Sequence, residues 1–128
     1  MTDAVVAGHL CIDIIPRIPA DAAADPEQLL APGRLVEVGE AVLSTGGAVS
    51  NTGLALAKLG LNVRLVARVG DDDIAAMTRA ILKRHGADLG RDLRVAHGEP
   101  SSYTIVVNPP GRDRSFLHCP GTNNTFGP

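Results

Sequence analysis

The pattern that most constrains the fold of this chain is an amphipathic helix placed between two apolar segments. An apolar run begins at residues 5–8 and continues to Ile15, as expected of a buried strand in an α/β sheet. Residues 48–59 repeat apolar side chains at helical spacing and end before Gly60, a common helix stop. Residues 63–69 then form a second apolar strand. Together these segments predict a βαβ unit with a right-handed crossover, and therefore a parallel sheet flanked by helices.

Three further segments predict a second, smaller sheet. Residues 35–43 alternate between apolar and polar side chains, which is typical of a half-exposed strand. Residues 102–108 and 114–118 read as two short strands joined by a Pro-Pro-Gly-Arg-Asp turn, and so predict a β-hairpin. We expect these three strands to form a partly exposed antiparallel sheet, separate from the parallel one. Residues 16–33 predict a connecting loop, and residues 73–84 a second helix that ends at His85 and Gly86.

Charge and cysteine content exclude several classes of function. The 128 residues carry 12 basic and 14 acidic side chains, and this net charge of −2 argues against a nucleic-acid-binding protein. Cys11 and Cys119 lie far apart without a metal-ligand spacing, so two reduced thiols are expected in place of a zinc site or a disulfide. The first ten residues do not resemble a signal peptide, and no apolar stretch reaches the length of a membrane span. A cytoplasmic protein that binds a small molecule is expected.

Gly46 and Gly47, at the start of the predicted helix, are candidate ligand-contacting residues. A glycine lets the backbone approach a ligand closely, and the free N–H groups of the first helical turn can donate to hydroxyl oxygens. Asn51, one turn later, carries an amide that both donates and accepts hydrogen bonds, as a vicinal diol requires. A plain turn before a helix is the alternative explanation of the glycine pair.

Asp13 interrupts an otherwise apolar run and is the second candidate. We expect its carboxylate where the strand leaves the sheet, the end at which open α/β sheets bind ligands. It would then accept hydrogen bonds from two adjacent sugar hydroxyls, and a turn-initiating aspartate is the alternative. Asp71 and Asp72, in contrast, precede the second predicted helix. We expect a structural capping role there, because aspartate is a preferred helix N-cap.

The charged residues of the hairpin and the histidines are weaker candidates. Arg114, near the second hairpin strand, could contact an anionic group of a substrate, whereas solvated surface charge is the alternative for it and for the neighbouring turn residues. The four histidines share no ligand spacing, and His118 remains a candidate pocket residue.

In their order and spacing, several of these motifs resemble the ribokinase-like (PfkB) carbohydrate kinases. They are the strand with Asp13, the segment from Gly46 to Asn51, residues 59–72, the hairpin, and Gly121-Thr122-Asn123. The resemblance implies an α/β fold with a parallel sheet and a small β-sheet lid, built near residues 12–44 and 100–119, that closes over a sugar. It covers the whole chain, 1–128, but only the N-terminal part of the family's domain. By resemblance the substrate-binding residues would be Asp13, Gly46, Gly47, Asn51, Ser102, Thr104 and Arg114.

The family's reaction transfers a phosphoryl group from ATP, with Mg²⁺, to a sugar hydroxyl. In the family this depends on a later glycine-rich segment that ends in a catalytic aspartate, and these 128 residues contain no such segment. We therefore expect a truncated chain that binds the sugar or nucleoside, lacks the catalytic base, and binds no cofactor alone. The alternatives are a short non-catalytic protein that binds sugar or pairs through its lid, and a truncated remnant. The resemblance also implies a homodimer through the lid strands, while the identity of the sugar stays open because Cys11 stands where many relatives have a polar residue.

Overall fold

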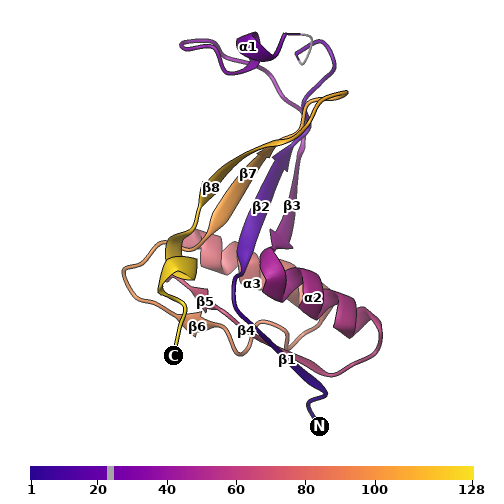
Figure 1. Cartoon of the computed structure of the whole chain (residues 1–128), viewed down its shortest axis with the longest axis vertical. Helices are drawn as coiled ribbons and strands as arrows, with labels where there is room; N and C mark the ends of the chain where they lie inside the picture. The colour runs from indigo at the N-terminus through magenta and orange to yellow at the C-terminus, as the bar shows by residue number, and fades with distance from the viewer. Residues whose placement is uncertain (23–24) are drawn as a thin grey trace.

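The computed structural model describes residues 1–22 and 25–128, which form a body of helices and short strands with a four-stranded sheet projecting from it (Figure 1). In the body, strand β1 (Ala4–Ala7) pairs in parallel with β4 (Val63–Val66). Helix α2 (Gly47–Lys58) packs against both strands. A helix therefore lies between two parallel strands in the sequence, as predicted, and the α/β class is confirmed.

The remaining body elements complete the core. Helix α3 (Asp73–His85) follows the short strand β5 (Arg68–Val69), which pairs in parallel with β6 (Arg94–Val95). A 3-10 helix, η1 (Gly121–Thr125), packs against β5. Apolar side chains from these elements form one buried cluster, which includes Leu10, Val49, Leu65 and Leu82. None of the helices in residues 1–22 and 25–128 is long and apolar enough to cross a membrane.

The projecting sheet, which we name the lid after its position, has the strand order β3-β2-β7-β8. Its strands are β2 (Cys11–Pro16), β3 (Ala41–Gly46), β7 (Tyr103–Val107) and β8 (Ser115–Cys119). The central pair, β2 and β7, is parallel, whereas β3 and β8 pair antiparallel at the two edges. The short helix α1 (Pro26–Leu29) lies beyond the far end of the lid (Figure 1).

Both predicted helices and the β-hairpin are confirmed within about a residue. Gly60 ends α2 with a φ of +88°, a left-handed conformation that glycine adopts readily. At the other helix, the Asp72 carboxylate accepts a hydrogen bond from the Ala75 amide and so caps α3. The hairpin is β7 and β8, joined through residues 108–114.

The prediction of one continuous strand up to Ile15 was wrong. The apolar run divides into β1 and β2, which belong to different sheets. Gly8 separates them with a φ of +140°, which redirects the backbone, while the Leu10 amide is held by the Asn123 side chain at 3.1 Å. Residues 63–69 divide in the same way, into β4 and β5. An apolar run alone does not reveal such a division, because both halves are apolar.

The predicted strand over residues 35–43 was also displaced. Only its end belongs to β3, which begins at Ala41, opposite Pro16 at the end of β2. Beyond this pair, backbone hydrogen bonds join Arg17 to Glu40 and Gly39, but the regular ladder has ended, and Leu35 is 86% exposed. The lid is separate from the parallel sheet of β1 and β4, as expected. It is a mixed sheet and not an antiparallel one, because β2 joins it and pairs in parallel with β7.

Candidate functional site

Four polar residues lie in register across the lid. Asp13 on β2 is paired with Ser44 on β3 and with Thr104 on β7, and Thr104 is paired in turn with His118 on β8. Side chains at paired positions of neighbouring strands point to the same face of a sheet. Ser44, Asp13, Thr104 and His118 therefore form one polar row on a single face, with Cys11 beside it two residues before Asp13.

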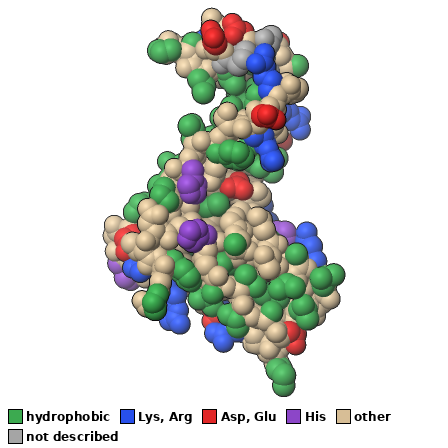
Figure 2. All heavy atoms as spheres, viewed as in Figure 1, with side chains coloured by type: hydrophobic (Ala, Val, Ile, Leu, Met, Phe, Trp, Pro, Cys, Tyr) green, Lys and Arg blue, Asp and Glu red, His purple; other side chains and the backbone are tan. Residues whose placement is uncertain are grey.

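Hydrogen bonds connect the members of this row. The Thr104 hydroxyl lies 2.9 Å from Nδ1 of His118 and 3.9 Å from Sγ of Cys11. The Cys11 thiol in turn donates to Oδ1 of Asp13 at 3.5 Å. Figure 2 shows acidic and histidine side chains together near the base of the lid. The row thus places a carboxylate and an imidazole on one accessible face, joined through buried polar atoms.

The Cys11 side chain is held as a neutral thiol. Burial, and next the negative charge of Asp13, raise the pKa of Cys11 to about 11. A thiol with this pKa stays protonated at neutral pH and is a poor nucleophile. Cys11 therefore contributes to this site the hydrogen bond that it donates to Asp13. Neither Cys11 nor Cys119 forms a disulfide.

Asp13 does not lie where its strand leaves the sheet, as was expected, but inside β2. The prediction failed because β2 continues past it to Pro16 as a lid strand and is not part of the parallel sheet. Its carboxylate instead packs against the start of α2, where a Cβ on Gly46 would lie 2.5 Å from Oδ2 of Asp13. The carboxylate is thus placed at a helix N-terminus, whose partial positive charge stabilises an anion.

Gly47 is required by the packing of the chain on itself. Its φ is +85°, and a Cβ there would lie 2.6 Å from the carbonyl oxygen of His9. The same carbonyl accepts a hydrogen bond from the Val49 amide at 3.0 Å. The amides of Gly47 and Ala48 have no carbonyl one turn earlier to pair with, as at every helix start. The glycine pair is therefore more than a plain turn, because it allows the segment just before β2, at His9 and Leu10, to approach the first turn of α2 closely.

The other residues predicted to bind substrate are Asn51, Ser102 and Arg114, and they lie outside the polar row. Asn51 is exposed on α2, one turn after Gly47 and on the same side of the helix. Ser102 is 3% exposed and donates its hydroxyl to the Cys119 carbonyl, which is a structural contact between hairpin strands. Arg114 precedes β8, outside the row, and its guanidinium lies 5.9 Å from the centre of the Phe116 ring. The structure thus brings together Asp13, Gly46, Gly47 and Thr104.

Cys11, Ser44 and His118 had not been assigned to the site from the sequence, although His118 was considered. The register of the hairpin could have indicated that His118 lies beside Thr104. Val107 pairs with Ser115 next to the turn, and three positions further along each strand Thr104 pairs with His118. Ser44 was hidden because the strand that carries it had been placed too early. The role of Cys11 depends on a neighbour 93 positions away in the sequence, Thr104.

Of the two aspartates before α3, Asp72 has the predicted capping role, whereas Asp71 contacts a loop. Asp72 accepts hydrogen bonds from the Ala75 amide and from both the amide and the hydroxyl of Ser101. Although burial opposes the charged form, these hydrogen bonds from Ser101 and Ala75 lower the pKa of Asp72. Asp71 accepts from the Gly98 amide and from His97, which lowers its pKa too.

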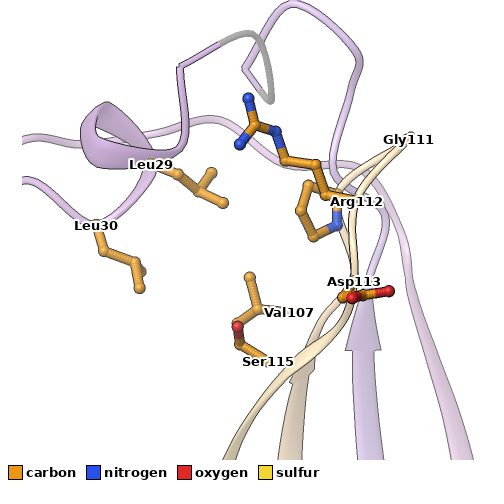
Figure 3. A pocket seen from close by; sticks show the side chains of 8 residues that line it. Leu29, Leu30, Val107, Gly111, Arg112, Asp113 and Ser115 are labelled. Carbon is orange, nitrogen blue, oxygen red and sulfur yellow. The ribbon is translucent and has the colours of Figure 1, made fainter.

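A large hollow lies at the tip of the lid, away from the polar row. It has a volume of about 770 Å³, and Figure 3 shows Leu29 and Leu30 reaching from the α1 side toward Val107 and Ser115 on the hairpin. Arg112 and Asp113 also line it. Leucines line one side of the hollow, and polar residues of the hairpin turn line the other. None of the lining residues belongs to the polar row.

Within residues 1–22 and 25–128, no group of three or more His, Cys, Asp or Glu side chains is arranged to hold a metal ion. The Asp13 carboxylate can accept hydrogen bonds and the start of α2 can donate them, which is the combination that a ligand with hydroxyl groups needs.

Comparison with known proteins identifies the family of the chain. The family described as pfkB family carbohydrate kinase matches residues 1–128. Among solved structures, ribokinase from Thermotoga maritima is 19% identical with a TM-score of 0.69, and Arabidopsis thaliana ribokinase complexed with ribose and ATP is 22% identical with a TM-score of 0.68. Each alignment covers 95% of this chain but 37% of the ribokinase. The nucleoside kinase of Methanocaldococcus jannaschii is 20% identical, with a TM-score of 0.66 over 95% of this chain and 38% of its own.

The chain thus spans little more than a third of the length of these structures, and at such identities they establish the fold. The match of the family over all 128 residues establishes the membership. This chain belongs to the pfkB family of carbohydrate kinases.

Proposed function

We propose that this chain forms the sugar-binding part of a cytoplasmic kinase that transfers a phosphoryl group from ATP to a hydroxyl of a sugar or nucleoside. The observation that carries the proposal is the Asp13 carboxylate held against Gly46 at the start of α2. This places an anionic acceptor next to free backbone donors, and a vicinal diol needs both.

In the proposed complex, Asp13 accepts hydrogen bonds from two adjacent hydroxyls of the sugar. The first-turn amides of α2, at Gly47 and Ala48, donate to hydroxyl oxygens, and the exposed Asn51 amide provides both functions one turn later. A hydrogen bond to a charged group contributes about 1.5–3 kcal/mol, so loss of the Asp13 charge would weaken binding strongly. Thr104 supports the row from β7, while Ser102 and Arg114 have a more distant part, in the hairpin that covers the sugar.

The transfer step needs groups other than these. Phosphoryl transfer requires donors that stabilise charge on the transferred phosphate, a base for the attacking hydroxyl, and Mg²⁺ bound with ATP. The chain spans 37% of the length of the Thermotoga maritima ribokinase structure, which leaves most of that length outside these residues. We place these groups in a further part of a longer polypeptide, so that the role of this chain is to bind and orient the sugar and to exclude water.

We also propose that two copies pair through the lid, using the face opposite the polar row. Leu43, Ile14, Ile105 and Leu117 lie in register there, one position along each strand from the polar row. Leu43 is 39% and Leu117 is 54% exposed, so burying this apolar row against a second copy would be favourable.

The proposal is tested by calorimetric titration of the chain with neutral sugars, sugar acids and nucleosides. The test variant is Asp13→Asn, and Asp113→Asn in the hairpin turn is the matched control. We expect a sugar to bind, the Asp13→Asn variant to bind it at least roughly tenfold more weakly, and the control to bind it unchanged. No binding of any compound, or equal binding by both variants, would contradict the assignment. Assaying ATP consumption by the same samples separates a binding protein from a kinase.

A further inference from the structure

Asp13 fixes the direction of the first hydrogen bond in a chain of groups that runs through Cys11 and Thr104 to His118. An ionised carboxylate only accepts, so the single hydrogen of the Cys11 thiol is donated to Oδ1 of Asp13. The sulfur is then left as an acceptor for the hydroxyl hydrogen of Thr104. The thiol cannot reverse this order at neutral pH, because it stays protonated with a pKa of about 11.

The last group in the chain is His118. With its hydrogen directed to Cys11, the Thr104 oxygen is free to accept a hydrogen bond from Nδ1 of His118, which lies 2.9 Å away. In that arrangement a neutral imidazole carries its hydrogen on Nδ1 and presents Nε2 as a bare acceptor. Since His118 is exposed while Cys11 and Thr104 are buried, Nε2 is the end of the chain that a ligand can reach.

The polar row consequently has an acceptor on either side of Thr104. Asp13 and His118 lie on the strands that flank β7, roughly 10 Å apart at the strand spacing of a sheet. Asp13 and His118 can each accept a hydrogen bond from a donor on the ligand, and a hydroxyl group is such a donor. A carboxylate or phosphate in the same place would face a negative charge at one end and a lone pair at the other.

We propose that His118 is a second hydroxyl-accepting residue of the sugar site, positioned by Thr104 and Cys11, and that the site therefore selects neutral polyhydroxylated sugars over sugar acids and sugar phosphates. This inference rests on the proposed function, because it assumes that the sugar binds at the face of Asp13. Cys11 and Thr104 act as positioning residues, since they orient the imidazole through its hydrogen bond.

The first test reads the hydrogen position on His118 directly. In the ¹⁵N-histidine-labelled chain, NMR distinguishes a ring protonated at Nδ1 from one protonated at Nε2, and His118→Gln identifies the signal. We expect the Nδ1–H form in the unmodified protein. Cys11→Ala frees the Thr104 hydrogen to be donated to Nδ1, so the ring should change to the Nε2–H form. Cys11→Ser keeps one donor and one acceptor at that position and should restore the Nδ1–H form.

The second test compares binding of a neutral sugar, ribose or fructose, with binding of gluconate. Both neutral sugars should bind more tightly than gluconate to the unmodified chain. Cys11→Ala should weaken neutral-sugar binding by roughly threefold to tenfold, the usual range for one hydrogen bond, and Cys11→Ser should recover it. Thr104→Val, a change of similar volume, gives the same readout if Cys11→Ala does not fold.

The outcomes separate this inference from the proposed function. Sugar binding that depends on Asp13, together with an Nε2–H ring in the unmodified chain or preferred binding of gluconate, overturns the inference and leaves the proposed function standing. Absence of any sugar binding overturns both. The Nδ1–H form, its loss in Cys11→Ala and its return in Cys11→Ser, with matching changes in affinity, support the inference.

Discussion

Oδ2 of Asp13 occupies the space that a side chain at residue 46 would need, because a Cβ on Gly46 would lie only 2.5 Å from it. The two residues come from antiparallel neighbours in the lid, β2 and β3, and Gly46 is also the residue that caps α2. One glycine thus couples the lid, the helix start and the carboxylate.

Gly46→Ala should therefore displace the Asp13 carboxylate. We expect sugar binding to weaken at least roughly tenfold, because the hydrogen bonds to that charge are lost or misaligned. Titration calorimetry measures the change, and circular dichroism checks that the chain still folds. Gly127→Ala is the matched control, since nothing lies within 4 Å of its added Cβ. Equal sugar affinity of the two variants would mean that Asp13 does not need this position.

Asp72→Ala should destabilise the body of the protein. The variant loses the cap of α3 and leaves the Ser101 amide and hydroxyl without their acceptor. The expected loss is about 1–3 kcal/mol in the free energy of unfolding. Urea unfolding measures it. Asp71→Ala, which removes a neighbouring carboxylate from an exposed loop contact, should cost distinctly less, and a reversed order would contradict the roles assigned to this pair.

The ion pair between Arg64 and Asp92 should make the chain sensitive to acid. The Arg64 guanidinium bonds both oxygens of Asp92, at 2.9 and 2.8 Å, and lowers the pKa of Asp92 from 3.8 to about 2. A pKa that is lower in the folded state stabilises the protein above the unfolded value, and this stabilisation disappears as pH falls from about 4 to 2.

Asp92→Asn should therefore lower stability near neutral pH and flatten the decline between pH 4 and 2. Unfolding followed at several pH values gives the two profiles. Asp113→Asn, in the hairpin turn, serves as the control and should keep the slope of the unmodified chain. A steep decline that persists in Asp92→Asn would show that other carboxylates cause it.

Leu117→Glu should prevent pairing through the lid. The substitution places a charge in the apolar row opposite the polar row, where an interface between two copies would bury it. Light scattering after gel filtration should show a dimer for the unmodified chain and a monomer for the variant. Phe116→Glu is an adjacent control on the other face, at a residue that is 57% exposed, and should leave the dimer intact. A dimer in both variants would place the contact elsewhere.

Local patterns in the sequence were sufficient for the helices and the hairpin. The helical spacing of residues 48–59, the stop at Gly60 and the cap at Asp72 all act within a few residues, so their structure follows from the sequence nearby. The family resemblance carried the candidate residues Asp13, Gly46, Gly47 and Thr104, which the structure brings together.

The tertiary structure alone decided how the apolar run before Ile15 divides between two sheets, and which residues share the face of Asp13. Both depend on strand pairing between segments that are distant in the sequence: β2 lies beside β7, some 90 residues later, and β8 then brings His118 to Thr104. Apolar periodicity records that a segment is buried, but it does not record its neighbour. The proposed chain of hydrogen bonds from His118 through Thr104 and Cys11 to Asp13 depends on that pairing. It could be inferred only once the register of the lid strands was known.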